Sequence, residues 1–534
     1  MSTPTDGEQP DLVSPNPQPE PNPKSPLNGN GDDEEPDFEY EEQEEEDEYE
    51  DVEEEHDPTP PKSEPRRTQA RMENLARRMQ HEAVSLRVHD VIIKGNTKTK
   101  DYLIEAELEP IKAASTVQEL LNAARVVNFR LQALETFDSV NITLDAGPRE
   151  LPGTANVIIN VVETVSPLSG QIGAFTRAEA RSSTMEASLK YKNLFGHGDL
   201  WDGSLVYGCD YSAEVSAGVH LPRFKGLVTP VSARVYLLSQ DWLKYSSYKE
   251  RALGLSLGLV TTKYHDVAYN LAWRTLTDPS QMSSSSIRRQ LGHGLLSSLK
   301  YTFKIDRRNS SLRPTRGYVF ASGTQIGGLA PDSRSLRFLR QELDLRYAFP
   351  LGFYRAALNV GISGGVIFPW GAGFLKRPSP LPERFFLGGN ISPLCSLGGP
   401  TALWGFKTRG LGPTEPRRQI VDVNADSSDR DYLGGDLAVT AFADLSFDFP
   451  LKWLREKGIH GHVFGCAGNV AKLTQNEYQN FSPRKFLESF RSSVGVGLVV
   501  PTALFRMELN YCYILNKLDH DRGKSGVSFT FSAS

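Results

Sequence analysis

The sequence predicts an all-β membrane protein: a 16-stranded antiparallel transmembrane β-barrel, preceded by one small α+β domain and a disordered acidic N-terminal arm. Three observations lead to this prediction. From residue 168 onward, segments of roughly 9–15 residues alternate between apolar and polar side chains. Gly, Asp, Asn or Pro separates these segments, and no helical pattern lies between them, which excludes a parallel α/β sheet. The charge is also divided unevenly between the first 65 residues and the rest.

The acidic arm, residues 1–65, contains 24 acids and only two bases, Lys24 and Lys62, which gives a balance of −22. Subtracting this from the net charge of −7 leaves +15 for the remaining chain. Pro, Glu and Asp dominate the arm, and its apolar residues are too few to offset the entropy of ordering, so we expect it to be disordered. Such a segment is either a solvated tail or an acidic docking arm for basic partners.

Residues 66–87 have a helical pattern in which Met72, Leu75 and Met79 share one face and basic residues cover the others. We interpret this segment as a linker helix, with a helix that lies on a membrane surface as the alternative. The chain before it is acidic and lacks the apolar core of a signal peptide, so we expect no cleaved targeting sequence. No apolar run reaches the roughly 18 residues that a transmembrane helix requires.

Residues 88–165 form the predicted α+β domain. The stretch "RVHDVIIKG" is typical of a short strand, and "KDYLIEAEL" and "TVQELLNAARVVNFRLQALETF" have helical periods. Thr116 and Glu119 stand at the spacing of a capping box at the start of the second helix. "DSVNITLDAG" and "TANVIINVVET" then alternate as strands. The predicted order is β-α-α-β-β, with the helices covering one face of the sheet.

Residues 168–534 form the predicted barrel. Strands are expected at 170–180, 183–194, 199–210, 212–222, 228–240, 248–260, 265–275, 292–306, 317–326, 334–348, 354–367, 436–448, 459–470, 491–501, 504–514 and 524–532. Their length suits a tilted crossing of the membrane, and an even number lets the first and last strands close the sheet. Aromatic residues near strand ends fit the interface girdles of such barrels. They are Trp201, Tyr207, Trp242, Tyr347, Phe349, Tyr354, Phe449 and Trp453.

Motifs for enzymes and metal sites are missing from the sequence. There is no P-loop, no G-x-G-x-x-G after a strand, no H-E-x-x-H and no G-x-S-x-G. His460 and His462 share a strand face, but no carboxylate cluster accompanies them in sequence. The four cysteines form no CxxC pair, which argues against a disulfide scaffold and a zinc site. They are Cys209, Cys395, Cys466 and Cys512. We expect no catalytic residue, no metal, no cofactor and no nucleic-acid partner.

Several motifs resemble those of barrel-type protein insertases and translocases. "FDSV" after the long helix, followed by two strands, resembles the polypeptide-transport-associated (POTRA) domain, present in one copy. "NLFGHGD" at 193–199 resembles the first hairpin of that superfamily. "RRNSSLRPTRGYVF" at 307–320 carries its Pro-x-Arg-Gly element as Pro314, Arg316 and Gly317. "RFFLGG" and "YLGGD" bracket residues 385–435, which resemble the superfamily's long lumenal loop. The motif residues there are Phe385, Gly388, Gly389, Gly434 and Gly435.

The resemblance implies that this loop folds back into the lumen and carries a hydrophobic-Arg-Gly-Phe tip. Here the tip reads Leu403-Trp404-Gly405-Phe406, so Trp404 stands where the family has Arg. The alternative alignment takes Arg409-Gly410-Leu411 as the tip.

In many relatives the tip Arg pairs with an acid on a facing strand. The matching stretch here is "VFGCAGN", with Cys466 at the position of the acid and Gly468 two residues further on. Removing one partner alone would leave a buried charge at a cost of roughly 3–5 kcal/mol, whereas replacing both can be neutral. We therefore expect Trp404 to pack against the wall near Cys466, and Lys407 or Arg409 to supply any cation that the loop still needs.

The last predicted strand, "KSGVSFTF" at 524–531, resembles the insertion signal of mitochondrial barrels. That signal has a polar residue, a glycine and two hydrophobic residues at fixed spacing. The matching residues are Lys524, Gly526, Phe529 and Phe531.

With one POTRA unit and sixteen strands, the chain resembles the core β-barrel subunits of the mitochondrial sorting and assembly machinery, which are outer-membrane insertases. The resemblance implies that the first and last strands part and that a precursor's signal strand adds to the exposed edge by β-augmentation. The first strand, "GQIGAFTRAEA" at 170–180, is rich in small and polar residues and suits a weak gate.

The implied partners are β-barrel precursor proteins, accessory subunits of a membrane complex and the lipid bilayer, with the POTRA domain in the intermembrane space. Two other functions stay open from the sequence. One is an insertase or protein-conducting channel of the chloroplast outer envelope from the same superfamily. The other is a passive porin, which would need neither a POTRA unit nor a long lumenal loop.

Overall fold

The protein was analysed as a computed structural model, in which the described part of the chain is divided by short gaps. It comprises residues 85–175, 184–208, 210–223, 229–331, 336–371, 376–389, 392–394, 397–400, 402–418, 430–475, 477–501 and 505–533. The acidic arm and residues 66–84 of the predicted linker helix lie outside it. Arg87, the last residue of that predicted helix, begins a strand instead. All described residues belong to one compact unit, Met72–Ser534.

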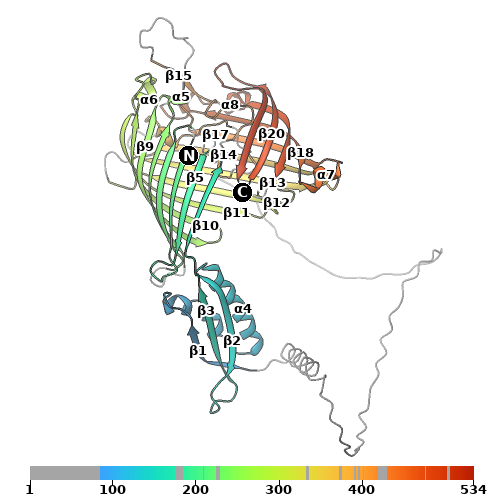
Figure 1. Cartoon of the computed structure of the whole chain (residues 1–534). Helices are drawn as coiled ribbons and strands as arrows, with labels where there is room; N and C mark the ends of the chain where they lie inside the picture. The colour runs from blue at the N-terminus through green and yellow to red at the C-terminus, as the bar shows by residue number, and fades with distance from the viewer. Residues whose placement is uncertain are drawn as a thin grey trace, which may run out of the picture. The chain divides into compact units, whose positions relative to one another are not determined.

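The N-terminal α+β domain is a three-stranded sheet with helices on one face (Figure 1). Its strands are β1 (Arg87–Lys94), β2 (Phe137–Ala146) and β3 (Thr154–Glu163), and its helices are α2 (Asp101–Glu105), α3 (Glu109–Lys112) and α4 (Val117–Ala133). β3 lies in the centre, parallel to β1 and antiparallel to β2. Two helices were expected. The structure has three, because a separate short helix, with Pro110 in its first turn, begins at Glu109 after α2.

The long helix α4 begins as its sequence predicts. The Thr116 hydroxyl accepts a hydrogen bond from the Glu119 amide at 3.2 Å, and the Glu119 carboxylate accepts one from the Ser115 amide at 2.9 Å. Val127 and Leu131 lie on the face of α4 that packs against the sheet, and both are fully buried. This packing makes the domain a folded body with its own core.

The rest of the chain forms one 16-stranded antiparallel sheet, as predicted, curved into a barrel wall. Its strands are β4 (Leu168–Phe175), β5 (Thr184–Lys192), β6 (Leu200–Gly208), β7 (Ala213–Leu221), β8 (Val231–Asp241), β9 (Lys249–Thr262), β10 (His265–Thr277), β11 (Gly292–Asp306), β12 (Gly317–Gly327), β13 (Phe338–Pro350), β14 (Ala357–Pro369), β17 (Leu437–Asp448), β18 (His460–Ala471), β19 (Arg491–Pro501), β20 (Phe505–Asn516) and β21 (Gly526–Ala533). Each strand pairs with its neighbour in the sequence, and β14 pairs with β17 across the long loop.

Short helices and a two-stranded ribbon occupy the loops of the barrel. They are α5 (Leu243–Ser246), α6 (Ser285–Arg288), η1 (Leu381–Glu383), β15 (Thr414–Pro416), β16 (Arg430–Tyr432), α7 (Lys452–Glu456), η2 (Glu477–Asn480) and α8 (Pro483–Glu488). Among the described residues, no helix has both the length and the apolar character needed to cross a membrane.

The terminal strands β4 and β21 stand at the two ends of the sheet order. Within the described residues no hydrogen-bonded ladder joins them, although every other neighbouring pair of barrel strands has one. Residues 176–180 of the predicted first strand lie outside the described residues. We call the junction between β4 and β21 the seam.

Strand β13 shows why the wall is that of a membrane barrel. Leu343, Leu345 and Tyr347 are 48%, 51% and 46% exposed, whereas Asp344 and Arg346 between them are 1% and 6% exposed. The outward face is therefore apolar and the inward face polar, which is the arrangement expected when the solvent outside is lipid.

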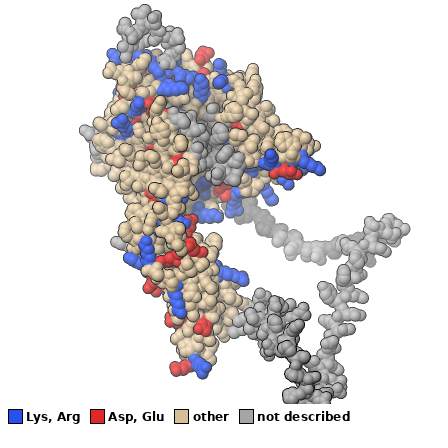
Figure 2. All heavy atoms as spheres, in the orientation of Figure 1, with Lys and Arg blue, Asp and Glu red and all other residues tan. Residues whose placement is uncertain are grey.

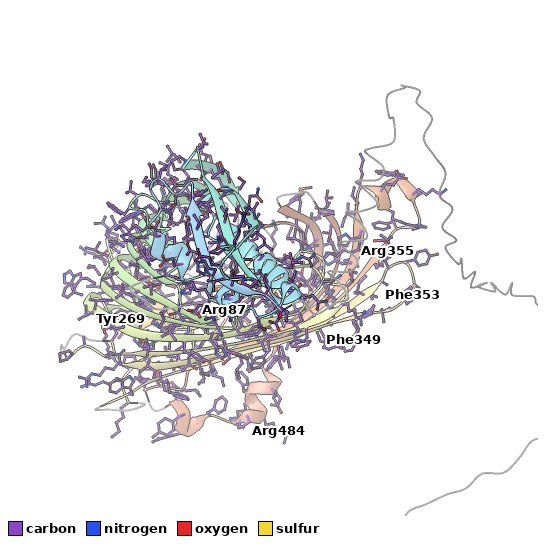
Figure 3. The ribbon with its side chains drawn as sticks, turned by 90° about the horizontal axis from the view of Figure 1, so that it is seen from below. Arg87, Tyr269, Phe349, Phe353, Arg355 and Arg484 are labelled. Atoms are coloured by element: carbon purple, nitrogen blue, oxygen red, sulfur yellow. The ribbon has the colours of Figure 1, made fainter. Side chains whose placement is uncertain are left out.

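Aromatic side chains lie near one end of the same strands. Phe349 at the end of β13 and Phe353 in the turn after it are 44% and 57% exposed and point away from the wall (Figure 3). They fit an interface girdle. Trp242, which the sequence analysis assigned to that girdle, is buried inside instead, because it packs on a cation from the lumenal loop described below.

Candidate functional site: the lumenal loop and the last hairpin

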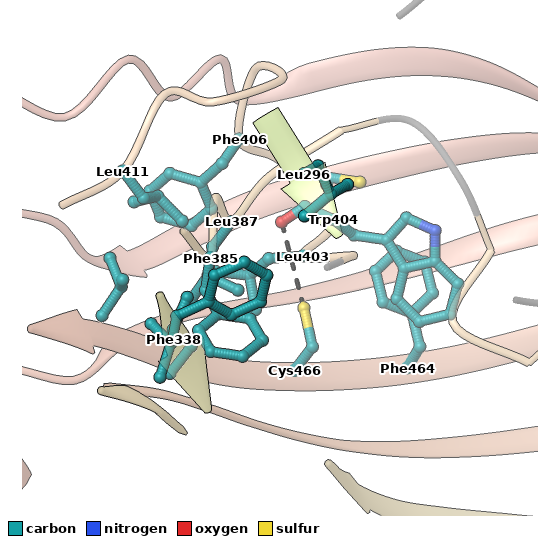
Figure 4. Close-up of a cluster of buried hydrophobic side chains, with 14 of the residues drawn as sticks. Leu296, Phe338, Phe385, Leu387, Leu403, Trp404, Phe406, Leu411, Phe464 and Cys466 are labelled. Carbon is teal, nitrogen blue, oxygen red and sulfur yellow. Dashed lines mark hydrogen bonds between the residues drawn. The ribbon is translucent and has the colours of Figure 1, made fainter. Parts of the chain in front are cut away.

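The long loop between β14 and β17, residues 370–436, brings apolar side chains into the barrel lumen. Leu403, Trp404, Phe406 and Leu411 of the loop are at most 1% exposed. They pack with inward-facing residues of the wall, among them Phe464 of β18 (Figure 4). The loop is thus held by a hydrophobic core inside the barrel.

Trp404 lies in the centre of this core. Its ring is 4.1 Å from the Phe464 ring and 6.1 Å from the His462 ring, measured between centroids. Its carbonyl oxygen accepts a hydrogen bond from the Ser493 hydroxyl at 2.6 Å and faces the Cys466 Sγ at 3.9 Å. The backbone of Trp404, rather than its indole, therefore lies against Cys466. The indole Nε1–H has no acceptor among the described residues.

The two predicted wall residues both face the loop. Cys466 is buried, and its Sγ lies 3.1 Å from the Ser493 hydroxyl. A Cβ at Gly468 would lie 3.0 Å from the Thr440 side chain and 3.4 Å from Leu403. The small residues Cys466 and Gly468 leave the room in which the loop tip is seated.

The two predicted cations of the loop lie in different surroundings. Lys407 is exposed. Arg409 is buried, with its guanidinium 3.1 Å from the Trp242 ring centroid and 3.8 Å from that of Phe386. It also donates a hydrogen bond to the Tyr248 hydroxyl at 2.9 Å. Arg409 therefore anchors the loop near α5 by cation–π contacts, far along the sheet from Cys466.

The paired glycines allow close approach of backbone segments inside the loop. Gly388 has φ +103°, and a Cβ there would lie 2.3 Å from the Lys407 carbonyl oxygen. The Gly389 amide donates to the Phe406 carbonyl at 3.0 Å. Gly388 and Gly389 thus hold the tip from the N-terminal side.

The second pair, Gly434 and Gly435, lies opposite Phe385. Isolated β-bridge contacts join Phe385 and Gly435, and a Cβ at Gly434, which has φ +64°, would lie 2.9 Å from the Phe385 carbonyl oxygen. The Arg340 guanidinium carbon lies 4.7 Å from the centroid of the buried Phe385 ring. The second glycine pair therefore closes the base of the loop, whereas the first holds its tip.

The loop tip also pairs with residues 517–525, the hairpin that connects β20 to β21. The Lys407 amide donates to the Arg522 carbonyl at 2.9 Å, and the Arg522 amide donates to the Gly410 carbonyl at 2.8 Å. The Lys524 amide donates to the Gly405 carbonyl at 2.8 Å. We call these three hydrogen bonds the clamp. They tie the last hairpin to the lumen side of the barrel, next to the seam.

The last strand carries the predicted signal residues. Gly526 begins β21 with φ +132°, two residues after Lys524 of the clamp. Phe529 is 60% exposed and pairs with Leu509 of β20. Phe531 is in register with Met507, and its side chain lies outside the description. Phe529 is thus placed on the lipid-facing row of this strand.

The Pro-x-Arg-Gly element lies in the turn before β12. Pro314 is buried, Arg316 is exposed, and Gly317 begins the strand with φ +112°. A Cβ at Gly317 would lie 2.2 Å from the Arg307 carbonyl oxygen, so only glycine fits. The side-chain oxygen of Asn309 accepts from the Arg316 amide at 3.2 Å. The element shapes this turn and does not contact the loop tip.

A buried polar chain next to Trp404 was not found by sequence reasoning. His462 Nδ1 lies 2.7 Å from the Asp444 carboxylate, and Nε2 lies 2.7 Å from Asn510 Oδ1. Asn510 in turn donates to Glu508 at 3.0 Å, and Arg506 donates to Glu508 at 2.7 Å. No carboxylate cluster stands beside His462 in the sequence; the structure places one carboxylate, that of Asp444, against it, and a second, that of Glu508, behind Asn510. Asp444 comes from the neighbouring strand β17, in the register that pairs His462 with Ser446. Asn510 comes from β20 and reaches His462 across Gly497 of β19, where a Cβ would lie 2.0 Å from the Asn510 Oδ1.

The loop 193–199 connects the barrel to the N-terminal domain. Asn193 Nδ2 donates to the Thr99 hydroxyl at 2.8 Å, and the Lys100 amide donates to the Gly196 carbonyl at 2.9 Å. Within the loop, Asp199 accepts from the Phe195 amide at 3.1 Å and from Trp201 Nε1 at 2.6 Å. Burial raises the pKa of Asp199, but these hydrogen bonds outweigh it and lower that pKa.

The described residues contain no cluster of three or more His, Cys, Asp or Glu side chains placed to hold a metal ion. The site is built from main-chain hydrogen bonds and apolar contacts between loop, wall and last hairpin. Such an arrangement can hold or release strands.

The fold and this site define a POTRA-bearing barrel with a lumenal loop. The Omp85 superfamily domain model matches residues 193–534, and the POTRA model, described as a surface antigen variable number repeat, matches residues 86–164. The chain belongs to the Omp85 superfamily.

Within the superfamily, the chain is similar to sorting and assembly machinery component 50 homologues. The Xenopus laevis homolog B is 28% identical over 479 residues, which cover 87% of this chain and 92% of the relative. The Homo sapiens homologue is 28% identical over 455 residues, covering 83% and 89%. The fold is also that of BamA from Haemophilus ducreyi lacking POTRA domains 1–3, with a TM-score of 0.67 at 16% identity over 84% and 85% of the two chains.

Proposed function

We propose that this chain assembles β-barrel precursors into the mitochondrial outer membrane, and that the seam between β4 and β21 opens sideways to do so. One observation carries the proposal: β21 is paired on one side only. Its ladder with β20 runs from Phe505–Ala533 to Cys512–Gly526, while its other edge has no ladder with β4 among the described residues. An unpaired strand edge inside a membrane must find a partner strand, because lipid offers no hydrogen bonds.

A precursor strand would supply that partner. It adds to the free edge by β-augmentation, in which main-chain hydrogen bonds give affinity and side-chain pockets give selectivity. Later hairpins of the precursor pair in turn with the strand before them. The process needs no covalent chemistry.

The clamp gives the lumenal loop a defined part in this process. The wall must stay intact at β20 while the seam opens, and the hydrogen bonds from the Lys407, Arg522 and Lys524 amides hold the last hairpin from inside. The loop therefore supports one side of the gate. We further propose that the N-terminal domain receives precursors on the intermembrane-space side, and that accessory subunits complete a membrane complex, as the machinery named for the relatives suggests.

A crosslink across the seam tests lateral opening. Ile172→Cys and Val527→Cys lie on exposed positions of β4 and β21. We expect that joining them with a flexible bismaleimide abolishes the assembly of an imported β-barrel precursor in isolated mitochondria, with binding of the precursor to the complex retained. Unchanged assembly with a fully crosslinked seam would rule out lateral opening.

The matched control joins two strands that are already paired. Leu509→Cys and Phe529→Cys are directly opposite on β20 and β21. This crosslink adds the same reagent to the same strand and leaves the seam free, so assembly should continue. Both pairs are made in a background in which Cys209 and Cys395 are replaced by serine.

Two measurements separate the alternatives. Organelle fractionation distinguishes a mitochondrial from a chloroplast protein. Conductance in a planar bilayer tests the passive porin: the loop core that packs Trp404 and Phe406 against the wall argues against a wide open pore. A large, steady conductance of the intact chain would contradict the proposal.

A further inference from the structure

A cavity of about 420 Å³ lies at the rim of the barrel where β10 ends and β11 begins. Strand alternation puts this rim at the end of the barrel opposite the loop 193–199. The cavity exists because β11 starts at Gly292, whereas its ladder with β12 starts only at Ser298. We call it the rim pocket. The side chains used below are Arg274, Gln290, His293, Arg337, Trp370 and Arg377.

The rim pocket carries positive charge that the described residues do not neutralise. The positive charge of Arg274 is compensated, because the carboxylates of Glu383 and Glu250 lie 2.6 Å and 3.4 Å from its guanidinium. Arg337 and Arg377 have no ion-pair partner in the described part of the chain. Both side chains are exposed, and the Arg337 guanidinium lies 5.5 Å from the centre of the Trp370 ring at the pocket wall.

Neutral donors add to these charges. Gln290 Oε1 accepts a hydrogen bond from the Leu381 amide at 2.8 Å, which fixes the orientation of the side-chain amide. Gln290 Nε2 is then buried without an acceptor among the described residues. His293 uses Nδ1 for a 2.9 Å contact with the Thr275 hydroxyl. An oxyanion in the pocket would give the Gln290 amide the acceptor it lacks.

The remaining lining of the rim pocket is apolar. The pocket lies at the depth of the membrane–water interface. Leu276, Leu336 and Leu381 line the pocket beside the cationic groups. Trp273 and Trp370, near the ends of β10 and β14, are 38% and 39% exposed, as in an interface girdle. Figure 2 shows Lys and Arg side chains gathered on this end of the barrel. A ligand here needs an anionic group joined to an apolar part.

We propose that the rim pocket binds the phosphate headgroup of an anionic phospholipid, with the phosphate between Arg337 and Arg377 and the glycerol and upper acyl carbons against the leucines. Guanidinium groups match phosphate oxygens in geometry and keep their charge at the membrane surface. This inference does not depend on the assembly function.

The test uses the full chain in detergent micelles and a soluble short-chain lipid, dihexanoyl phosphatidic acid, with ligand-induced thermal stabilisation as the readout. We expect saturable stabilisation of the wild type, and about tenfold weaker binding for Arg337→Gln/Arg377→Gln, since charge-assisted hydrogen bonds are lost. Arg484→Gln is the matched control, because Arg484 lies on α8 outside the wall and pairs with the exposed Glu488 (Figure 3). Without lipid, all variants should unfold at the wild-type temperature.

Three outcomes would overturn the proposal. Equal binding by wild type and the double variant would show that Arg337 and Arg377 do not bind the lipid. Equal binding of dihexanoyl phosphatidylcholine, which carries no net charge, would remove the need for an anionic headgroup. Saturation by inorganic phosphate at the same concentrations as the lipid would show a phosphate site in which the apolar lining plays no part.

Discussion

At the scale of residues, the loop tip is held by shape and main-chain hydrogen bonds. Trp404 fills the space between Phe464 and His462, and its carbonyl, not its ring, meets Cys466 and Ser493. The sequence identified Trp404 and Cys466 as a pair that departs from the family. The orientation of the indole depends on Phe464 and His462, two and four residues before Cys466, which face the lumen only through the register of β18.

Trp404→Ala should therefore destabilise the loop. Truncating a buried Trp typically costs about 3–5 kcal/mol, because transfer free energy is lost and a cavity is left. Trp404→Phe should cost less, since it also removes an Nε1–H that lacks an acceptor. The free energy of unfolding in detergent checks both. Trp453→Ala, at an exposed Trp of α7, is the control, and an equal loss there would contradict a buried anchor.

A second residue-scale prediction concerns Glu163 at the end of β3. Burial raises the pKa of Glu163, but hydrogen bonds from Thr99 at 2.7 Å, from Thr97 at 2.7 Å and from Lys98 at 3.0 Å outweigh it and lower that pKa from 4.5 to about 2. Because the folded pKa is depressed, the stabilisation is fully present above pH 4.5 and is lost as the pH falls through about 2.

Glu163→Gln should cost roughly 1 kcal/mol at pH 7, a value reduced by solvent screening. The difference from wild type should shrink below pH 4.5 and vanish near pH 2. Thermal unfolding between pH 2 and 7 measures it. Glu150→Gln, at an exposed carboxylate, should show no such difference at any pH. A pH-independent difference for Glu163→Gln would mean that shape, not charge, is responsible.

At the scale of elements, the clamp between loop and last hairpin is the feature that sequence patterns could not supply. The glycine motifs and the tip predicted that a loop enters the lumen. They did not predict which hairpin it would reach, since the contact joins Gly410 with Arg522, more than a hundred positions later. In the same way, Lys407 or Arg409 was expected to supply a cation at the tip. Arg409 instead packs on Trp242 and donates a hydrogen bond to Tyr248, near α5.

Gly410→Ala should open the clamp. A Cβ there would lie 2.8 Å from the Lys407 carbonyl and 2.9 Å from the Arg522 carbonyl, so the two backbones must separate. We expect roughly tenfold faster hydrogen exchange at the Arg522 amide, equivalent to about 1.4 kcal/mol. Gly203→Ala, whose Cβ would find its nearest atom at 4.0 Å, is the control. Unchanged protection at Arg522 in Gly410→Ala would mean that the clamp contributes nothing to the hairpin.

At the scale of the whole molecule, most of the fold could be predicted and most of its inner contacts could not. A wall that is polar inside and apolar outside requires side chains that alternate with period two. The sixteen strands could therefore be predicted from the sequence. Strand limits shifted by a few residues, and a short extra helix, α3, follows the first predicted one, because such ends depend on local hydrogen bonds. The partners of His462 lie on other strands, so single-strand patterns missed them.

The connection between the N-terminal domain and the barrel gives the prediction at this scale. Gly196 has φ +79°, and a Cβ there would lie 2.2 Å from the Lys98 carbonyl. Gly196→Ala should break the hydrogen bond from Lys100 and widen the distance distribution between spin labels at Phe129 of α4 and Leu237 of β8, measured by pulsed EPR. Gly153→Ala has the same strained backbone, φ +82°, and no atom within 4 Å, so its distribution should match wild type. Equal widening in both would point to backbone strain alone.

The position of the lumenal loop in the sequence has a consequence for the order in which this protein folds after synthesis. The loop ends at residue 436, but the carbonyl and amide of Arg522 that seat its tip are made almost at the end of synthesis. Contacts between such distant positions form late and slowly. Until the final hairpin arrives, the nascent wall lacks its inner support and exposes edges on both sides. A new chain therefore completes its lumenal core only once its last hairpin has been made.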